Sequence, residues 1–105
     1  MNNEQQTLKR IKEIVIRQVP GPKVYLYGSR ARGEAKQTSD WDLLILLSND
    51  KITIDMERNV TYPLYDLEFE IGEVISPLVY SEKEWNEKYK VTPFYAAVMQ
   101  EGKLL

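Results

Sequence analysis

The sequence predicts an α+β fold, an α/β sandwich in which a small mixed sheet of three to four strands packs against helices. Two observations support this fold class. Several segments carry apolar residues at helical spacing, and short β-favouring runs alternate with them along the chain. A chain of 105 residues can bury one modest core. We therefore expect a single domain over residues 1–105.

The first predicted element is an amphipathic helix over residues 7–19, which Pro20-Gly21-Pro22 ends. The apolar residues on one face of this helix are Leu8, Ile11, Ile14, Val15 and Val19. A β-favouring run at residues 24–27 follows and stops at Gly28, so we expect a strand that leads into a tight turn. Residues 29–36 are small, basic and polar, which suits a short helix or a loop.

The segment 40–47 is mostly apolar and is closed by Ser48-Asn49-Asp50. Its length and apolar run predict a central strand that is buried on both faces. Residues 53–71 carry an apolar stripe at helical spacing, formed by Met56, Val60, Leu64, Leu67 and Ile71. Pro63 should kink or split this helix, and Gly72 should end it.

Residues 73–80 predict a third strand, and Pro77 favours an edge position or a bulge because proline cannot donate to a sheet. The spacing in Ser81-Glu82-Lys83-Glu84 is typical of a capping box and predicts a short helix. Thr92-Pro93 predicts the start of a last helix that Gly102 ends. The aromatic residues near this end, Trp85, Tyr89, Phe94 and Tyr95, are expected to cover the sheet.

The composition excludes several kinds of chemistry. The chain has no cysteine and no histidine, which excludes the usual zinc sites, Cys/His pairs and Ser/His/Asp triads. Its net charge of -2 lacks the basic surface of a dedicated nucleic-acid binder. No apolar run approaches the roughly 20 residues of a membrane span, and the polar start lacks signal-peptide character. We expect a cytoplasmic protein without a membrane partner.

The chemically informative stretch joins a phosphate-suited loop to a pair of acids. Gly28 lets the backbone turn sharply, and a helix starting near Ser29 would direct free N–H groups at an anion. Arg30 and Arg32 add positive charge to the loop. In an extended chain, Asp40 and Asp42 share a face with Cα atoms roughly 6.5 to 7 Å apart.

These two carboxylates can converge on one metal ion. Magnesium prefers oxygen ligands and is commonly held by one or two carboxylates together with substrate phosphates. The alternating pattern turns Trp41 to the opposite face, where a core or interface role is expected.

A P-loop is a rival interpretation, because Gly28 and Gly33 match the start of the pattern G-x-x-x-x-G-K-[ST]. It fails because Glu34 and Ala35 stand where a lysine and a hydroxyl residue are needed. The dinucleotide-binding pattern G-x-G-x-x-G is also absent.

Gly28-Ser29, Gly33 and Ser39-Asp40-Trp41-Asp42-Leu43 resemble the G-S…G…S-D-x-D-L signature of the polymerase-beta-like nucleotidyltransferase superfamily. The short chain is similar to its minimal branch, the MNT domains, which commonly occur as antitoxins beside HEPN-domain toxins. The resemblance implies the polymerase-beta-like nucleotidyltransferase fold. It also implies that Gly28 and Ser29 bind the triphosphate, with Arg30 and Ser39 as further nucleotide-binding candidates. Asp40 and Asp42 would be the catalytic residues and the ligands of Mg²⁺.

The family's third carboxylate is replaced in this chain. Its position on the next strand corresponds to Ser76, a poor substitute for a residue that ligates metal or activates a hydroxyl. Glu68, Glu70 or Glu73 could take its place, and the sequence does not decide among them.

Two functional hypotheses follow. The first is magnesium-dependent transfer of a nucleoside monophosphate from a triphosphate, ATP above all, to a hydroxyl acceptor. The acceptor would be a partner protein, a small molecule or an RNA end, and a HEPN-type toxin or a homo-oligomer would complete the acceptor pocket. The second is a degenerate, antitoxin-like binding module that neutralises a HEPN-type partner without turnover.

Overall fold

The structure is a computed structural model that describes residues 3–36 and 38–105. The predicted domain 1–105 also contains residues 1, 2 and 37, which lie outside the described residues. The elements in chain order are α1 (Asn3–Gln18), β1 (Lys23–Tyr27), β2 (Trp41–Leu47), α2 (Ile54–Ile71), β3 (Ile75–Ser81), α3 (Glu82–Glu87), α4 (Pro93–Glu101) and β4 (Lys103–Leu104). The predicted α+β class and mixed sheet are confirmed.

The four strands form one sheet in the order β3-β2-β1-β4. Strand β1 is antiparallel to β2 and to β4, whereas β2 and β3 are parallel. Strand β2 lies inside the sheet and β3 lies at its edge, as the apolar run and Pro77 predicted. The two-residue strand β4 was not among the predicted elements.

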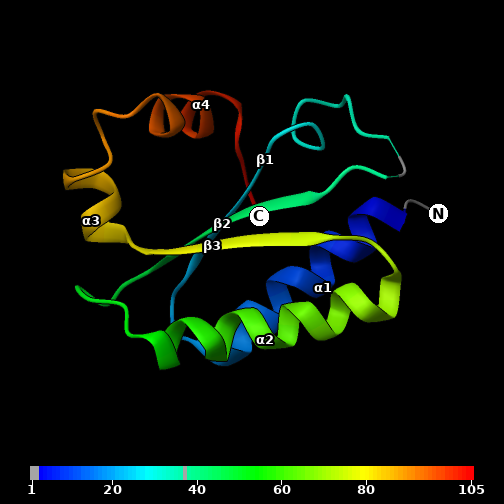
Figure 1. The fold of residues 1–105 in the computed structure, drawn as a ribbon, viewed down its shortest axis with the longest axis horizontal. Coiled ribbons are helices and arrows are strands. Elements are labelled where there is room, and N and C mark those ends of the chain that lie inside the picture. The colour runs from blue at the N-terminus through cyan, green and yellow to red at the C-terminus, as the bar shows by residue number, and fades with distance from the viewer. Residues whose placement is uncertain (1–2, 37) are drawn as a thin grey trace.

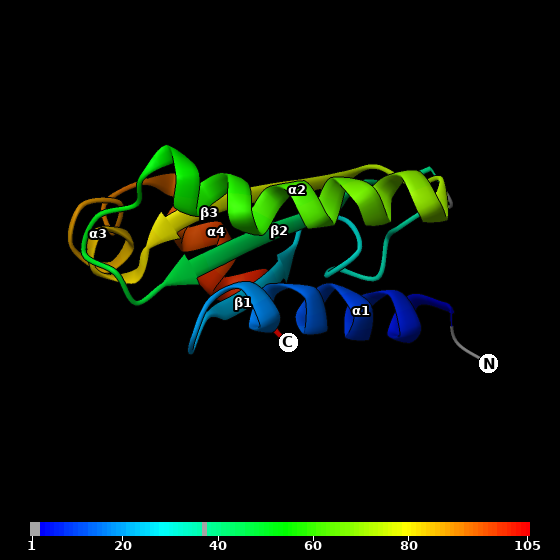
Figure 2. The same ribbon diagram turned by 90° about the horizontal axis from the view of Figure 1, so that it is seen from below.

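Helices cover both faces of the sheet. Figure 1 shows α1 and α2 together on one side and α3 and α4 on the other, and Figure 2 shows α1 and α2 from outside their layer. In the described part of the chain, no helix is sufficiently long and apolar to cross a membrane.

Strand β2 contributes to a core on each face, because its side chains alternate. The larger core packs under α1 and α2, and its β2 members are Trp41, Leu43, Ile45 and Leu47. The second core contains Leu44 and Leu46 with Trp85 and Val98. The predicted burial of β2 on both faces is confirmed, and so are the opposite directions of Trp41 and Asp42. Both tryptophans are almost fully buried.

The prediction that Pro63 splits the second helix is wrong. Helix α2 runs without interruption through Pro63, and Figure 1 shows one continuous ribbon. The buried residues Val60, Leu64 and Leu67 lie on both sides of the proline and pack into the same core. This shared burial outweighs the loss of one backbone hydrogen bond at the proline.

The first helix begins at Asn3, four residues before its predicted start, whereas the predicted capping residues of α2, α3 and α4 are confirmed. Thr92 and Ser81 cap α4 and α3 with their hydroxyl oxygens, which accept from Tyr95 N and Glu84 N. Gly72 ends α2 in the left-handed conformation, at φ 70°. This turn at Gly72 brings the chain back to the end of the sheet where β2 begins.

Candidate functional site

Three strand ends meet at one end of the sheet. β1 ends there, whereas β2 and β3 begin there, because β1 is antiparallel to β2 and β3 is parallel to it. Asp42 lies in register with Tyr27 on one side and with Ser76 on the other. The loop that follows β1 therefore lies beside the acid pair at the start of β2.

The loop after β1 is one hydrogen-bonded turn and not an α-helix. The N–H groups of Ala31 and Arg32 both donate to the carbonyl of Gly28, at N···O distances of 3.1 Å. The N–H of Glu34 donates to the carbonyl of Ser29 at 2.9 Å. The first N–H groups of such a turn have no partner within it and are suited to an anion.

Gly28 packs directly against Asp42. Its φ of +78° is left-handed, and a Cβ atom at this position would lie 3.2 Å from Cγ of Asp42 and closer still to Oδ2. Only glycine allows this approach at low cost. The structure thus brings the predicted loop and the predicted acid together.

Asp42 is half-buried, and Asp40 is exposed just before β2. Burial raises the pKa of the Asp42 carboxyl, and the negative charge of Asp40 raises it further. The two carboxylates are therefore close enough to repel each other. A divalent cation would relieve this repulsion, so the residues present fit magnesium.

No group of three or more His, Cys, Asp or Glu residues within residues 3–36 and 38–105 is placed to hold a metal. Phosphate oxygens and water would supply the remaining ligands, as they commonly do for magnesium.

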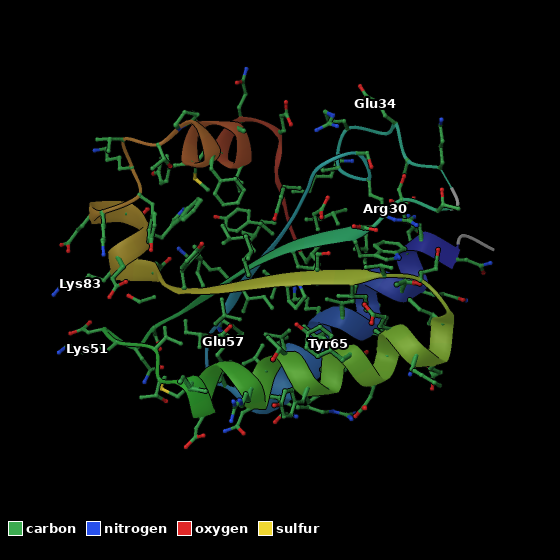
Figure 3. All side chains as sticks on the ribbon, in the orientation of Figure 1. Arg30, Glu34, Lys51, Glu57, Tyr65 and Lys83 are labelled. Carbon is green, nitrogen blue, oxygen red and sulfur yellow. The ribbon has the colours of Figure 1, made fainter. Side chains whose placement is uncertain are left out.

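The structure does not bring Arg30 to the aspartates. Its side chain is only 7% exposed and packs over the ring of Trp41, with Cζ 3.9 Å from the ring centroid. It donates from Nε and Nη2 to the carbonyl of Ser39 at 3.0 and 2.8 Å, and from Nη2 to Glu73 at 3.1 Å. Because Trp41 faces α1 and α2, these contacts hold Arg30 on the face opposite Asp42. In Figure 3, Arg30 lies beside the sheet and Glu34 on the outer side of the loop.

We expect Arg30 to stabilise the loop, so Arg30→Ala should lower the free energy of unfolding by about 2–4 kcal/mol, because it leaves Glu73 and a carbonyl without their cation. The control is Arg10→Ala, which removes an exposed ion pair with Glu70. That variant should cost at most about 1 kcal/mol. Urea unfolding of both variants measures the difference, and equal stabilities would contradict a supporting role for Arg30.

Ser39 has local partners. Its hydroxyl oxygen accepts from the N–H of Lys36 at 2.8 Å, and its carbonyl accepts from Arg30. These contacts fix the segment that leads from the loop to Asp40. Its predicted role as a nucleotide ligand stays a prediction.

Ser76 lies on the same face of the sheet as Asp42, at its register position on β3. The glutamates that could replace a third carboxylate have other partners. Glu68 accepts from the N–H of Ile75 at 2.8 Å, Glu70 pairs with Arg10, and Glu73 pairs with Arg30. The structure therefore places none of these three carboxylates beside Asp42.

Near Asp42, the sequence interpretation missed Tyr27, and it named Arg32 only as a positive charge of the loop. Burial and the charge of Asp42 raise the pKa of Tyr27 to about 12, so its hydroxyl stays protonated beside the acid pair at neutral pH. The positive charge of Arg32 lowers the pKa of the Asp42 carboxyl, whereas the negative charge of Asp40 raises it. Strand alternation before Gly28 could have placed Tyr27 on this face. No sequence pattern distinguishes Arg32 from Arg30.

The structure thus places a glycine turn beside the acid pair at the start of an internal strand. The family model for the nucleotidyltransferase domain matches residues 8–98, so the chain is a member of that family. A comparison with curated proteins gave no match.

Two solved structures share the fold. One is a crystal structure of a toxin-antitoxin with AMP-PNP, with a TM-score of 0.65 and 18% identity over 91% of this chain and 69% of that one. The other is a mutant of the toxin-antitoxin MntA-HpeT, with a TM-score of 0.59 and 18% identity over 93% of this chain and 70% of that one. The predicted nucleotidyltransferase family is thus confirmed, and the chain shares its fold with these two toxin-antitoxin structures.

Proposed function

We propose that the chain binds a nucleoside triphosphate with Mg²⁺ and transfers its nucleoside monophosphate to a hydroxyl acceptor. The observation that carries this proposal is the packing of Gly28 against Asp42, which places a phosphate-suited turn beside an acid pair. Membership of the nucleotidyltransferase family supports it. One of the similar structures contains AMP-PNP, which favours ATP as the donor.

In this proposal the turn holds the phosphates through Ser29 and free N–H groups, and Asp40 and Asp42 hold the cation. Magnesium, when bound there, neutralises charge that develops on the phosphates. The acceptor hydroxyl gives up its proton to water, and its oxygen attacks the α-phosphorus. The bond from the α-phosphorus to the bridging oxygen breaks, and pyrophosphate leaves. The Asp42 carboxyl must be ionised to bind the cation, and the positive charge of Arg32 favours that form.

The acceptor in this proposal is a hydroxyl on a second polypeptide. The similar solved structures are of toxin-antitoxins, which favours a toxin protein, of the HEPN type implied by the resemblance, as the partner.

The second candidate is a nucleotide-binding antitoxin without turnover. Ser76 favours it, because a hydroxyl stands in register with Asp42 where a carboxylate would be needed, and Glu68, Glu70 and Glu73 are held elsewhere. Under this candidate the site binds the nucleotide and cation, and the protein acts by occupying its partner.

Pyrophosphate release in the presence of magnesium, ATP and a hydroxyl acceptor distinguishes the two candidates. If the first is right, the wild-type protein releases pyrophosphate in step with labelling of the acceptor from α-labelled ATP. If the second is right, only Ser76→Asp gains this activity, whereas the uncharged control Ser76→Asn does not. Absence of release from all three proteins, with partner present, would contradict the transferase proposal.

A further inference from the structure

Helix α2 presents a row of aromatic side chains to solvent. Phe69 is 93% exposed, Tyr62 is 56% exposed and Tyr65 is 43% exposed. Their spacing of three and four residues places them on one side of the helix, opposite the buried Val60 and Leu64. Large apolar side chains that gather on one exposed helix face mark a surface that another molecule covers.

Helix α1 lies beside α2 and carries the opposite charge. Figure 2 shows the two helices side by side in one layer, running in opposite directions. The exposed charged side chains of α1 are four basic ones and one acidic one, Lys9, Arg10, Lys12, Arg17 and Glu13. Those of α2 are four acidic ones and one basic one, Asp55, Glu57, Asp66, Glu70 and Arg58. The layer therefore has a basic helix and an acidic helix, and the aromatic row belongs to the acidic helix.

A layer with one basic and one acidic helix is complementary to itself. A two-fold axis parallel to the helices, between two layers that face each other, places α1 of a second copy over α2 and α2 of that copy over α1. The basic helix then meets the acidic helix twice, as an isologous interface requires. Complementary charges of this kind select the partner and fix its register. The charge pattern of the layer thus favours a second copy of this chain as the molecule that covers it.

The same axis aligns the apolar side chains. Rotation about it leaves each residue at its own height along the helices, so α1 of the copy meets α2 in the alignment that the Arg10–Glu70 ion pair sets within one chain. Ile16 lies six residues beyond Arg10. Because the helices run in opposite directions, Ile16 of the copy is level with the turn that carries Tyr62 and Tyr65. The Ile16 side chain is 51% exposed in one chain, and the dimer would cover it with the aromatic row.

We propose that the chain forms a homodimer in which the α1–α2 layers of two copies pack face to face, with α1 of each copy over α2 of the other. This inference does not depend on the proposed nucleotide site. Asp42 lies on the other face of the sheet, because its neighbour Trp41 packs under α1 and α2. The dimer therefore leaves both candidate sites open to a nucleotide and to a partner protein.

The test is sedimentation velocity of the full chain at micromolar concentrations, where the wild type should sediment as a dimer. Phe69 is level with Arg10 of the second copy, so a charge placed at position 69 reports which helix it meets. Phe69→Lys should raise the dimer dissociation constant at least about thirtyfold, because it removes an aromatic contact and brings like charges together. Phe69→Glu loses the same contact but meets a basic helix, so it should raise the constant only about three- to tenfold.

Val91→Lys is the matched control, because Val91 is 88% exposed and lies between α3 and α4, outside the layer. This variant should dimerise like the wild type. A larger effect of Phe69→Glu than of Phe69→Lys would overturn the arrangement, since α2 would then face an acidic surface. A monomeric wild type would overturn the homodimer itself. In that case, loss of binding to a toxin protein in Phe69→Lys would assign the layer to that partner instead.

Discussion

Replacing Asp42 by asparagine is expected to abolish magnesium-dependent binding of ATP. The substitution keeps the shape of the side chain beside Gly28 and removes only its charge, so the turn should remain in place. Because the proposed metal site has two carboxylates, this substitution removes half of the negative charge that the protein supplies to the metal. We expect the affinity for ATP with magnesium to fall at least about a hundredfold, since one charged ligand of a metal or phosphate is worth several kcal/mol.

The same variant should be more stable than the wild type when no metal is present. The folded protein raises the pKa of the Asp42 carboxyl through burial and the charge of Asp40. The folded state therefore binds more protons than the unfolded state as the pH rises above the ordinary pKa of this group. Stability is lost as the pH rises through that window, and the loss persists at neutral pH.

Asparagine carries no such charge. In a chelating buffer, the melting temperature of Asp42→Asn should exceed that of the wild type at pH 7, and the difference should disappear at acidic pH, where the wild-type carboxyl is neutral. Magnesium and ATP should then stabilise only the wild type. A variant that is less stable than the wild type at pH 7 in chelator would show that Asp42 is not under electrostatic strain.

Gly28→Ala is the second substitution for which we expect a large effect. Gly28 and Gly33 both have left-handed backbones, with φ of +78° and +74°, and both belong to the same loop. A Cβ atom at position 28 meets the carboxyl of Asp42, whereas a Cβ atom at position 33 meets nothing within 4 Å. Gly33→Ala is therefore the matched control for backbone strain alone.

Both variants should lose about 1–2 kcal/mol of stability from the left-handed backbone. Only Gly28→Ala must also move Asp42, so it should weaken binding of ATP with magnesium by about tenfold or more, while Gly33→Ala should stay within about threefold of the wild type. Urea unfolding and ATP titration separate the two effects. Similar losses of affinity in both variants would mean that the contact between Gly28 and Asp42 does not organise the site.

Most of the fold could be predicted because its elements carry strong local patterns. The apolar run through Leu43–Leu47 is long enough for one strand and too uniform for a half-exposed one, and β2 is indeed buried on both faces. The helix ends at Gly72 and Gly102 follow from local capping chemistry.

The secondary-structure predictions failed where tertiary interactions decide the local structure. Pro63 does not interrupt α2, because the residues around it are buried on both sides. Strand β4 consists of Lys103 and Leu104 only, which is too short to show an alternating pattern, and it forms because α4 brings the chain end back to β1.

Those parts of the candidate site that lie within a short segment of the chain could be predicted from the sequence. Asp40-Trp41-Asp42 shows the alternation that separates the acids from the tryptophan, and Gly28 marks the turn. Arg30 and Arg32 are equivalent in the sequence, and only the packing against Trp41 and Glu73 turns Arg30 away.

The positions of the three glutamates are a further tertiary effect. Glu68, Glu70 and Glu73 could not be ranked from the sequence because their distances from Asp42 depend on the path of α2. Ser76, in contrast, was singled out by the family resemblance, which implied a position on the next strand. The register of β2 and β3 places it beside Asp42.

The central claim is that the turn after β1 and the aspartates of β2 form one site for a nucleoside triphosphate and magnesium. It is tested most directly by calorimetric titration of the wild-type chain with each of the four nucleoside triphosphates, with magnesium and with chelator. We predict saturable binding of ATP that requires magnesium and has a stoichiometry near one per chain. Absence of heat for every triphosphate at millimolar concentration, with magnesium present, would contradict the account for this chain.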